Sequence, residues 1–164
     1  MAKAPPEPAE DALAAAYDAW APRMHALARR LTGHGADAEE CVQEVFLRWA
    51  ERSAGAGRIE DLSAYLFASI RHAAAARARK GQRQAALHLH AVPAEEPAGA
   101  DQTRSLDGAL QRLPLEQREV VALKIDAGLT FAEIGRVLGI SQNTAASRYR
   151  YALARLKAAL EEEP

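Results

Sequence analysis

The sequence predicts an all-α protein with two small helical domains joined by a flexible linker, the second of them a helix-turn-helix domain. Alanine, leucine, arginine and glutamate dominate the composition, while β-branched residues and alternating apolar patterns are scarce. Apolar residues recur every three or four positions in two separate blocks of the chain. Between these blocks lies a stretch without periodicity that contains Pro93, Pro97 and Gly99, which is typical of a linker.

The first block begins with two predicted helices. Residues 11–31 carry apolar side chains at helical spacing, and Pro22 inside this pattern is expected to kink or split the helix. A break at residues 32–35 precedes the second helix, which Asp37 is expected to cap, with Glu40 at the third position. Each helix has an apolar stripe, as expected for a helix that packs on a core.

A third helix completes the first predicted domain, residues 11–81. Residues 53–57 predict a flexible loop, and the helix is expected to run from about Asp61 to Lys80. Gly81 is expected to end it. Basic residues crowd the later part of this helix, namely Arg71, Arg77, Arg79 and Lys80.

Two segments are expected to lie outside the domains. Residues 1–10 are rich in proline, alanine and acid and predict a disordered tail. Residues 82–104 are assigned to the linker, whose one apolar patch is Leu87–Val92. A linker of this length spans at most roughly 80 Å when fully extended, and roughly 25–30 Å as a relaxed coil.

The second predicted domain covers residues 105–164. Leu106 and Leu110 belong to an apolar helical stripe. Pro114 suits the first position of the next helix, which Gly128 is expected to close.

The end of this domain predicts a helix-turn-helix. Thr130 and Glu133 have the spacing of a capping box, and Gly139 can take the left-handed conformation that ends a helix. Ser141 is expected to cap the next helix, which is basic and has no acid before Glu161. The second helix of such a motif fits the major groove of DNA, although plain helical bundles also contain glycine corners and basic helix ends.

Charge and cysteine content narrow the function classes. The chain has 21 basic and 22 acidic residues, so it lacks the positive surplus that supplies most non-specific DNA affinity. This balance favours a subunit whose partner contributes DNA affinity over a stand-alone repressor. Cys41 is the single cysteine, which excludes an internal disulfide and suits a reducing cytoplasm. We expect neither a signal peptide nor a membrane-spanning segment.

Two motifs resemble conserved regions of bacterial sigma factors. Asp37–Phe46 resembles the signature of their second region, and Leu113–Val121 followed by the helix-turn-helix resembles their fourth region. Their order, with a linker and no module between them, is similar to the short extracytoplasmic-function (ECF) sigma factors. The resemblance implies a protein without enzymatic activity or cofactor that binds core RNA polymerase and promoter DNA and assists strand opening. It also implies an anti-sigma factor as a common means of control.

The resemblance implies polymerase contacts on the helix that carries the first signature. In the family this helix packs on a coiled coil of the polymerase clamp. The matching positions here are Asp37, Glu39, Glu40, Gln43, Glu44, Phe46 and Leu47. The apolar members of this helix, Phe46 among them, also fit a purely structural role in the core.

The resemblance further implies contacts with the opened minus-ten element from the following loop and helix. Unstacking a base costs a few kcal/mol, so it needs a pocket and a cationic surface. The candidate residues are Arg58, Tyr65, Arg71, His72, Arg77, Arg79 and Lys80. His72 stands where family members often have asparagine, and Tyr65 and Phe67 fit the core equally well.

The minus-thirty-five element is expected to be read as duplex by the second helix of the helix-turn-helix. Side chains in its first turns reach base edges or phosphates, and arginine can bond a guanine edge with two hydrogen bonds. The candidate residues are Ser141, Gln142, Asn143, Thr144, Ser147, Arg148 and Arg150. Tyr149, Leu153 and Leu156 share a helical stripe and are expected in the core instead.

Three other classes of function fit the sequence less well or leave part of it unexplained: a stand-alone regulator, a sigma mimic and an enzyme. A helix-turn-helix regulator that acts without polymerase explains the second domain but gives the acidic signature of the first no purpose. A sigma mimic would bind an anti-sigma factor instead of DNA. An enzyme is disfavoured because the five histidines lack metal-ligand spacing and no nucleophile or phosphate-loop motif is present. The pair His88 and His90 fits solvated loop histidines, so no metal or small-molecule substrate is expected.

Overall fold

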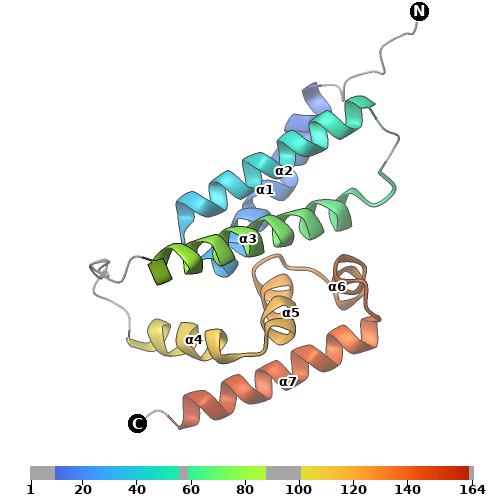
Figure 1. Ribbon diagram of the computed structural model, residues 1–164. Coiled ribbons are helices and arrows are strands. Elements are labelled where there is room, and N and C mark those ends of the chain that lie inside the picture. Colours follow the sequence, from blue (N-terminus) through green and yellow to red (C-terminus); the bar gives the residue numbers. More distant parts are fainter. Residues whose placement is uncertain (1–9, 56–58, 88–100, 163–164) are drawn as a thin grey trace, which may run out of the picture. The chain divides into compact units, whose positions relative to one another are not determined.

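The computed structural model describes residues 10–55, 59–87 and 101–162, and within these ranges it contains seven helices and no strand (Figure 1). The all-α fold class is therefore confirmed. The chain divides into two units between Gln82 and Arg83, which we call unit 1 and unit 2. No helix in the described ranges combines the length and hydropathy needed to cross a bilayer.

Unit 1 is built from α1 (Glu10–Thr32), α2 (Gly35–Gly55) and α3 (Leu62–Leu87) up to Gln82. Helices α1 and α2 pack side by side. Apolar side chains from all three helices are fully buried and form the core: Met24, Leu27, Val42, Val45, Leu66, Phe67 and Ile70. The edge of the Trp20 ring meets Phe67, with the ring centroids 5.9 Å apart, which ties α1 to α3.

Helix α1 is not split at Pro22. It runs through this residue as one helix, although proline cannot donate a backbone hydrogen bond. Pro22 itself lies on the exposed side of the helix, whereas Ala21 and Met24 beside it are buried. Burial of the neighbouring side chains thus outweighs the loss of one hydrogen bond.

The predicted capping role of Asp37 is wrong, because α2 begins two residues earlier, at Gly35. The turn before α2 uses Gly33, whose φ is 80°, and the Thr32 hydroxyl, which accepts a hydrogen bond from the His34 amide at 3.3 Å. Asp37 therefore lies inside the first turn of α2. Its carboxylate still faces the positive end of the helix dipole there.

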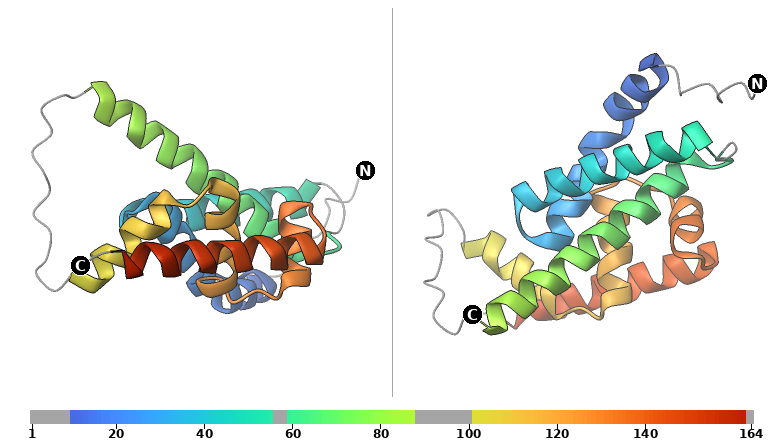
Figure 2. Two further views of the ribbon diagram at one scale, coloured as in Figure 1. Left: turned by 90° about the horizontal axis from the view of Figure 1, so that it is seen from below. Right: turned by 45° about the horizontal axis from the view of Figure 1, so that its top comes forward.

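The ends of α2 and α3 also differ from the prediction. Helix α2 continues to Gly55, so the loop expected from Ser53 starts too early, and residues 56–58 lie outside the described residues. Helix α3 begins after Asp61, whose carboxylate accepts a hydrogen bond from the Ala64 amide at 2.9 Å. It does not stop at Gly81 but continues to Leu87 (Figure 2). A glycine inside a helix costs about 1 kcal/mol, which flanking helix-forming residues can offset.

Unit 2 is built from α4 (Asp101–Arg112), α5 (Leu115–Ile125), α6 (Phe131–Leu138) and α7 (Gln142–Glu161). The first three of these helices all pack against α7. Side chains from α4, the turn after it, α5 and α7 form one buried cluster: Ala109, Leu110, Leu113, Val121, Ala152 and Leu156.

The predicted bounds of unit 2 need two corrections. Helix α4 begins at Asp101, four residues before the predicted start of the domain, because residues assigned to the linker extend this helix. Pro114 is the N-cap of α5 and not its first helical residue, since its ψ of 143° is not helical. Gly128, with φ 64°, lies in the turn after α5, as expected. The rest of the predicted linker, residues 88–100 with most of Leu87–Val92, lies outside the described residues.

Candidate nucleic-acid interface and docking surface

Helices α6 and α7 form the predicted helix-turn-helix. The Thr130 hydroxyl accepts a hydrogen bond from the Glu133 amide at 3.2 Å, and the Glu133 carboxylate accepts one from the Thr130 amide at 2.6 Å. Gly139 ends α6 with φ 67°, and the Ser141 hydroxyl caps α7 by accepting a hydrogen bond from the Thr144 amide at 3.0 Å. Every cap that the sequence predicted for this motif is confirmed.

Gly135 makes the tight corner between α6 and α7 sterically feasible. Its carbonyl accepts a hydrogen bond from the Ile140 amide at 3.0 Å. A Cβ atom at position 135 would lie 2.7 Å from the Ile140 carbonyl oxygen, closer than real Cβ contacts allow. Sequence reasoning missed this residue, although a glycine inside an apolar helical pattern is a signal of close backbone approach.

Aromatic and cationic contacts fix α7 against the rest of unit 2. The rings of Phe131 and Tyr149 pack with their centroids 5.5 Å apart, joining α6 to α7. The Lys124 ammonium lies 4.8 Å from the centroid of Phe131 and donates a hydrogen bond to the Leu129 carbonyl at 3.1 Å. These contacts hold the start of α6 against both α5 and α7.

The exposed face of α7 carries most of the residues predicted to contact duplex DNA. Ser141, Gln142, Asn143, Thr144 and Arg150 are exposed, while Ser147 is partly buried. The Arg150 guanidinium donates a hydrogen bond to the Ser147 hydroxyl at 3.2 Å. The first turns of α7 therefore present a polar surface with one cation.

A shallow groove runs along this face. It is lined by Phe131, Asn143, Ala146, Ser147, Tyr149, Arg150 and Leu153. Leu153 was predicted in the core, but 44% of it is exposed, so this prediction is wrong. The adjacent stripe through Tyr149 and Leu156 supplies the packing instead.

Arg148 points toward a different partner. Its guanidinium lies 3.1 Å from the Glu116 carboxylate of α5, and only 27% of its side chain is exposed. Arg148 therefore joins α7 to α5, whereas Arg150 stands on the open face.

The capping box gives a first testable prediction. Thr130→Ala removes the hydroxyl that accepts the Glu133 amide hydrogen bond, so we expect the free energy of unfolding of unit 2 to fall by about 1 kcal/mol. Thr130→Ser keeps the acceptor and should stay close to the wild type. Hydrogen exchange of the α6 amides in the full chain measures the difference, and equal exchange in both variants would contradict the prediction.

An apolar groove lies between α1 and α2 in unit 1. It is lined by Leu13, Ala14, Tyr17, Asp18, Gln43, Phe46, Leu47 and Ala50. Leu47 is 64% exposed and Tyr17 is 44% exposed, although both are large apolar residues. Phe46 is 6% exposed and lies between Tyr17 and Trp49, at centroid distances of 5.0 and 6.0 Å. Exposed apolar side chains over a hollow are typical of a protein docking surface.

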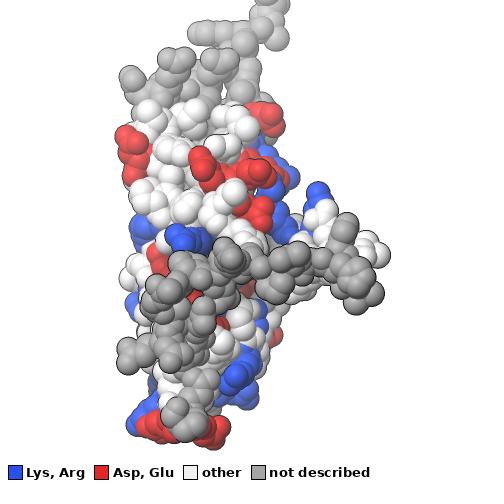
Figure 3. Space-filling model, turned by 90° about the vertical axis from the view of Figure 1, so that its left-hand side faces the viewer, with Lys and Arg blue, Asp and Glu red and all other residues white. Residues whose placement is uncertain are grey.

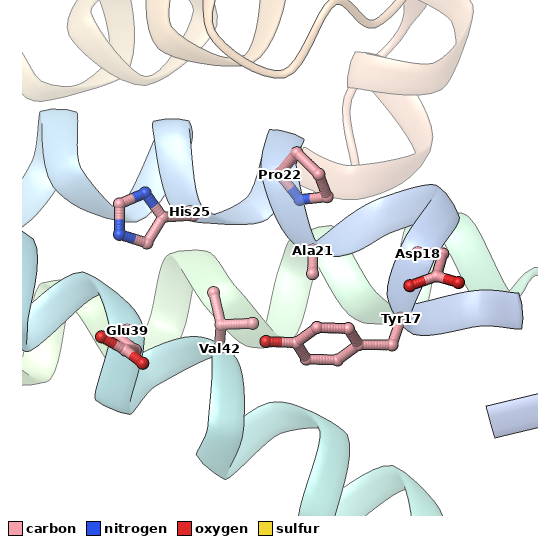
Figure 4. Close-up of a pocket in the computed structure, with 7 residues that line it drawn as sticks. All are labelled: Tyr17, Asp18, Ala21, Pro22, His25, Glu39 and Val42. Carbon is pink, nitrogen blue, oxygen red and sulfur yellow. The ribbon is translucent and has the colours of Figure 1, made fainter. Parts of the chain in front are cut away.

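The predicted polymerase-contact residues at this groove differ in their accessibility. Gln43 and Leu47 line it from the exposed side, whereas Phe46 forms its floor. Tyr17 belongs to the apolar residues at helical spacing in residues 11–31, a pattern that predicts burial, but 44% of it is exposed. A second hollow adjoins the groove, where Tyr17 and His25 of α1 face Glu39 and Val42 of α2 (Figure 4).

Charged side chains join α2 to α3. Arg77 of α3 lies 2.6 Å from a carboxylate oxygen of Glu40 and 3.3 Å from one of Glu44. Glu44 also pairs with Arg48. Figure 3 shows a face of unit 1 on which acidic side chains gather with basic ones directly beside them. Cys41 is fully buried next to this cluster, and burial raises the pKa of its thiol.

The predicted minus-ten residues differ in how accessible they are. Arg79 and Lys80 are exposed near the end of α3, and Arg71 lies 3.1 Å from the exposed His72 ring nitrogen. Tyr65 is half-buried beneath the Arg52 guanidinium, at 5.6 Å from its ring centroid. The sequence left open whether Phe67 belongs to the core, and the structure places this side chain fully buried in it. Arg58 lies outside the described residues, as do His88 and His90.

Two family models match the chain. The model of Sigma-70 region 2 matches residues 16–84, and the model of Sigma-70, region 4 matches residues 109–158. The first segment contains most of the residues that line the groove between α1 and α2, and the second contains most of the helix-turn-helix.

Several curated proteins are similar in sequence. The ECF RNA polymerase sigma factor SigM of Mycobacterium tuberculosis is 31% identical over 137 residues, which cover 82% of this chain and 69% of that protein. SigL of the same species is 31% identical over 157 residues, covering 90% and 88%. The RNA polymerase sigma factor CarQ of Myxococcus xanthus is 30% identical over 163 residues, covering 94% and 92%.

Two solved structures share the fold. The sigma factor RpoE in complex with the anti-sigma factor NepR, from Bartonella quintana, aligns with a TM-score of 0.68 at 23% identity, covering 92% of this chain and 98% of that one. CnrH in complex with the cytosolic domain of CnrY aligns with a TM-score of 0.71 at 19% identity, covering 94% and 91%.

Proposed function

The chain belongs to the ECF sigma factors. From this premise we propose which step of transcription initiation each of its two units performs. Like its family, the protein recognises promoters, and its partners are core RNA polymerase and promoter DNA. In our proposal, unit 1 docks on the polymerase and holds the opened minus-ten element, and unit 2 reads the minus-thirty-five element. Catalysis stays with the polymerase, and the protein acts in the cytoplasm, where the chromosome lies.

The groove between α1 and α2 carries the proposal for polymerase docking. An exposed Leu47 beside Gln43 offers an apolar anchor with a polar neighbour, as interface centres usually do. Four acids precede this anchor along α2 and suit a basic partner surface: Asp37, Glu39, Glu40 and Glu44. A stand-alone regulator would have no use for this surface.

The outer part of α3 is proposed to hold the displaced promoter strand. Arg71, His72, Arg79 and Lys80 place cationic and polar groups along one helix. Such a surface can track phosphates, while the half-buried Tyr65 offers a ring face on which a base can stack. Arg58, in the preceding segment, is proposed to join them.

Helix α7 is proposed to enter the major groove at the minus-thirty-five element. Its first turn exposes Ser141, Gln142, Asn143 and Thr144, and Arg150 follows on the same open face. Ser147 orients Arg150 through its hydroxyl. Arg148 is proposed to contact a phosphate only after it leaves its pairing with Glu116.

An anti-sigma factor is proposed as a further partner. Both structural neighbours were solved as complexes, RpoE with the anti-sigma factor NepR and CnrH with the cytosolic domain of CnrY. An exposed apolar groove needs a cover when no polymerase is bound, and a protein inhibitor would supply one.

Association of the full chain with core polymerase tests the docking proposal. We expect the two to migrate together in size-exclusion chromatography and the sigma factor alone to elute separately. A chain that binds promoter duplex specifically but never migrates with core polymerase would favour the stand-alone regulator.

Recognition by α7 gives a second prediction. Asn143→Ala removes an amide that can bond an adenine edge, so we expect duplex affinity to fall about fivefold, which corresponds to about 1 kcal/mol. The preference for the native minus-thirty-five element over a base-substituted one, measured as the ratio of the two affinities, should also decrease. Fluorescence anisotropy with polymerase holoenzyme measures both quantities.

Lys157→Ala is the matched control for this variant. Lys157 is exposed on the same helix and pairs with Glu161, well beyond the first turns. We expect it to keep the sequence preference of the wild type. An unchanged preference in Asn143→Ala would remove this residue from the proposed reading face.

A further inference from the structure

Arg77 stands between two surfaces with different proposed partners. It belongs to α3, whose basic residues are proposed to hold promoter DNA, yet its guanidinium contacts Glu40 and Glu44 of α2 at 2.6 and 3.3 Å. These two acids are proposed to face the polymerase. The same charged group therefore cannot serve DNA while it is paired with them.

The environment of Arg77 keeps it charged and held in place. Its side chain is 29% exposed, and it lies across two carboxylates on successive turns of α2. Burial opposes its charge, but the hydrogen bonds that it donates to Glu44 and Glu40 and the negative charge of Glu40 favour it, so the pKa of Arg77 is raised. A guanidinium stays charged under all ordinary conditions, so only a change of partner alters what it contacts.

The acids are more accessible than the arginine. Glu40 is 61% exposed, and Glu44 already shares its carboxylate with Arg48. A basic group approaching α2 from outside would therefore reach Glu40 first and compete with Arg77 for it. Loss of this contact would remove the shorter of the two carboxylate contacts of the Arg77 guanidinium and leave the longer one to Glu44.

We propose that Arg77 couples the two surfaces: Glu40 and Glu44 neutralise it in the free protein, and a basic surface that engages these acids frees it for a DNA phosphate. This inference rests on the proposed function, because it takes α2 as the polymerase-facing helix and α3 as the DNA-facing helix. The free chain then binds the opened strand weakly, and docking on the polymerase adds one cation to the strand-binding surface.

The experiment removes the carboxylate charges without polymerase. Glu40→Gln/Glu44→Gln in the full chain should bind a fluorescent single-stranded minus-ten oligonucleotide about two- to fivefold more tightly than the wild type, the range expected for a partly exposed ion pair. The plot of log affinity against log salt should steepen by about 0.7, which corresponds to one more phosphate contact. Adding Arg77→Gln to this variant should abolish both gains.

Two controls separate coupling from simpler effects. Glu51→Gln/Glu162→Gln changes the net charge by the same amount at exposed positions and should leave strand affinity at the wild-type level. Glu40→Gln alone removes the more exposed partner, so it provides the same test with a smaller gain if the double variant unfolds. An equal gain in the charge control, a gain that survives Arg77→Gln, or no gain in a folded Glu40→Gln variant would overturn the proposal.

These measurements distinguish the coupling from the proposed function itself. Strand binding is measured on the chain alone, so it does not depend on polymerase docking. If the wild type fails to bind core polymerase, the proposed function is wrong whatever the oligonucleotide shows. If the wild type binds core polymerase and the Arg77-dependent gain is absent, only the coupling is wrong.

Discussion

Replacing Leu47 with aspartate is expected to weaken binding of the chain to core RNA polymerase by about 30-fold. Leu47 is the most exposed large apolar residue of the groove between α1 and α2, and we place it at the centre of the docking surface. Truncation of a hot-spot residue costs about 2 kcal/mol or more, which is about 30-fold in affinity, and a buried unpaired carboxylate adds to that cost. Titration of labelled protein with core enzyme measures the change.

Leu87→Asp is the matched control for this variant. Leu87 is 81% exposed, lies at the end of α3 and does not line the groove. It should bind core polymerase with wild-type affinity, and neither variant should lose helix content, because neither leucine is buried. Wild-type affinity in Leu47→Asp would show that the polymerase docks elsewhere.

Replacing Gly135 with alanine is expected to destabilise unit 2 by about 1–3 kcal/mol, the usual cost of forcing an added methyl group into a packed site. The new Cβ would lie 2.7 Å from the Ile140 carbonyl oxygen. This oxygen belongs to the backbone of the turn, so the turn itself must shift and α7 must move with it. We therefore expect faster amide exchange in α6 and α7 and loss of binding to the minus-thirty-five element.

Gly108→Ala is the control for Gly135→Ala. Gly108 lies inside α4, and a Cβ there would meet no atom within 4 Å. The same substitution at this position should stabilise unit 2 by about 0.5–1 kcal/mol, because alanine forms helices better than glycine. If Gly135→Ala proves as stable as Gly108→Ala, the close approach of the turn does not constrain the motif.

Local signals in the sequence were sufficient to predict the helix-turn-helix. The capping box of Thr130 and Glu133 and the left-handed Gly139 involve residues within a few positions of one another, so their spacing determines the geometry. The ends of α3 were harder to predict. Gly81 lowers helix stability by only about 1 kcal/mol, so its effect depends on residues around it and not on its presence alone.

The candidate surfaces depended more on contacts between distant residues. Arg77 and Glu40 are 37 positions apart, so no spacing rule links them, and their pairing appears only once α2 and α3 are packed. The exposure of Tyr17 on α1 was equally difficult to predict, because an apolar residue at helical spacing is normally buried. The resemblance to the sigma factors directed attention to α2, α3 and α7, and packing decided which side chains on these helices are accessible.

Run-off transcription tests the central claim most directly, namely that this one chain both docks on polymerase and reads a promoter. Full-length protein, purified core RNA polymerase and a library of genomic upstream fragments are combined with nucleotides. The account predicts discrete transcripts that appear only when the protein is present, from templates that share two sequence elements. A chain that associates with core polymerase but yields no transcript from any fragment would contradict it and favour a sigma mimic.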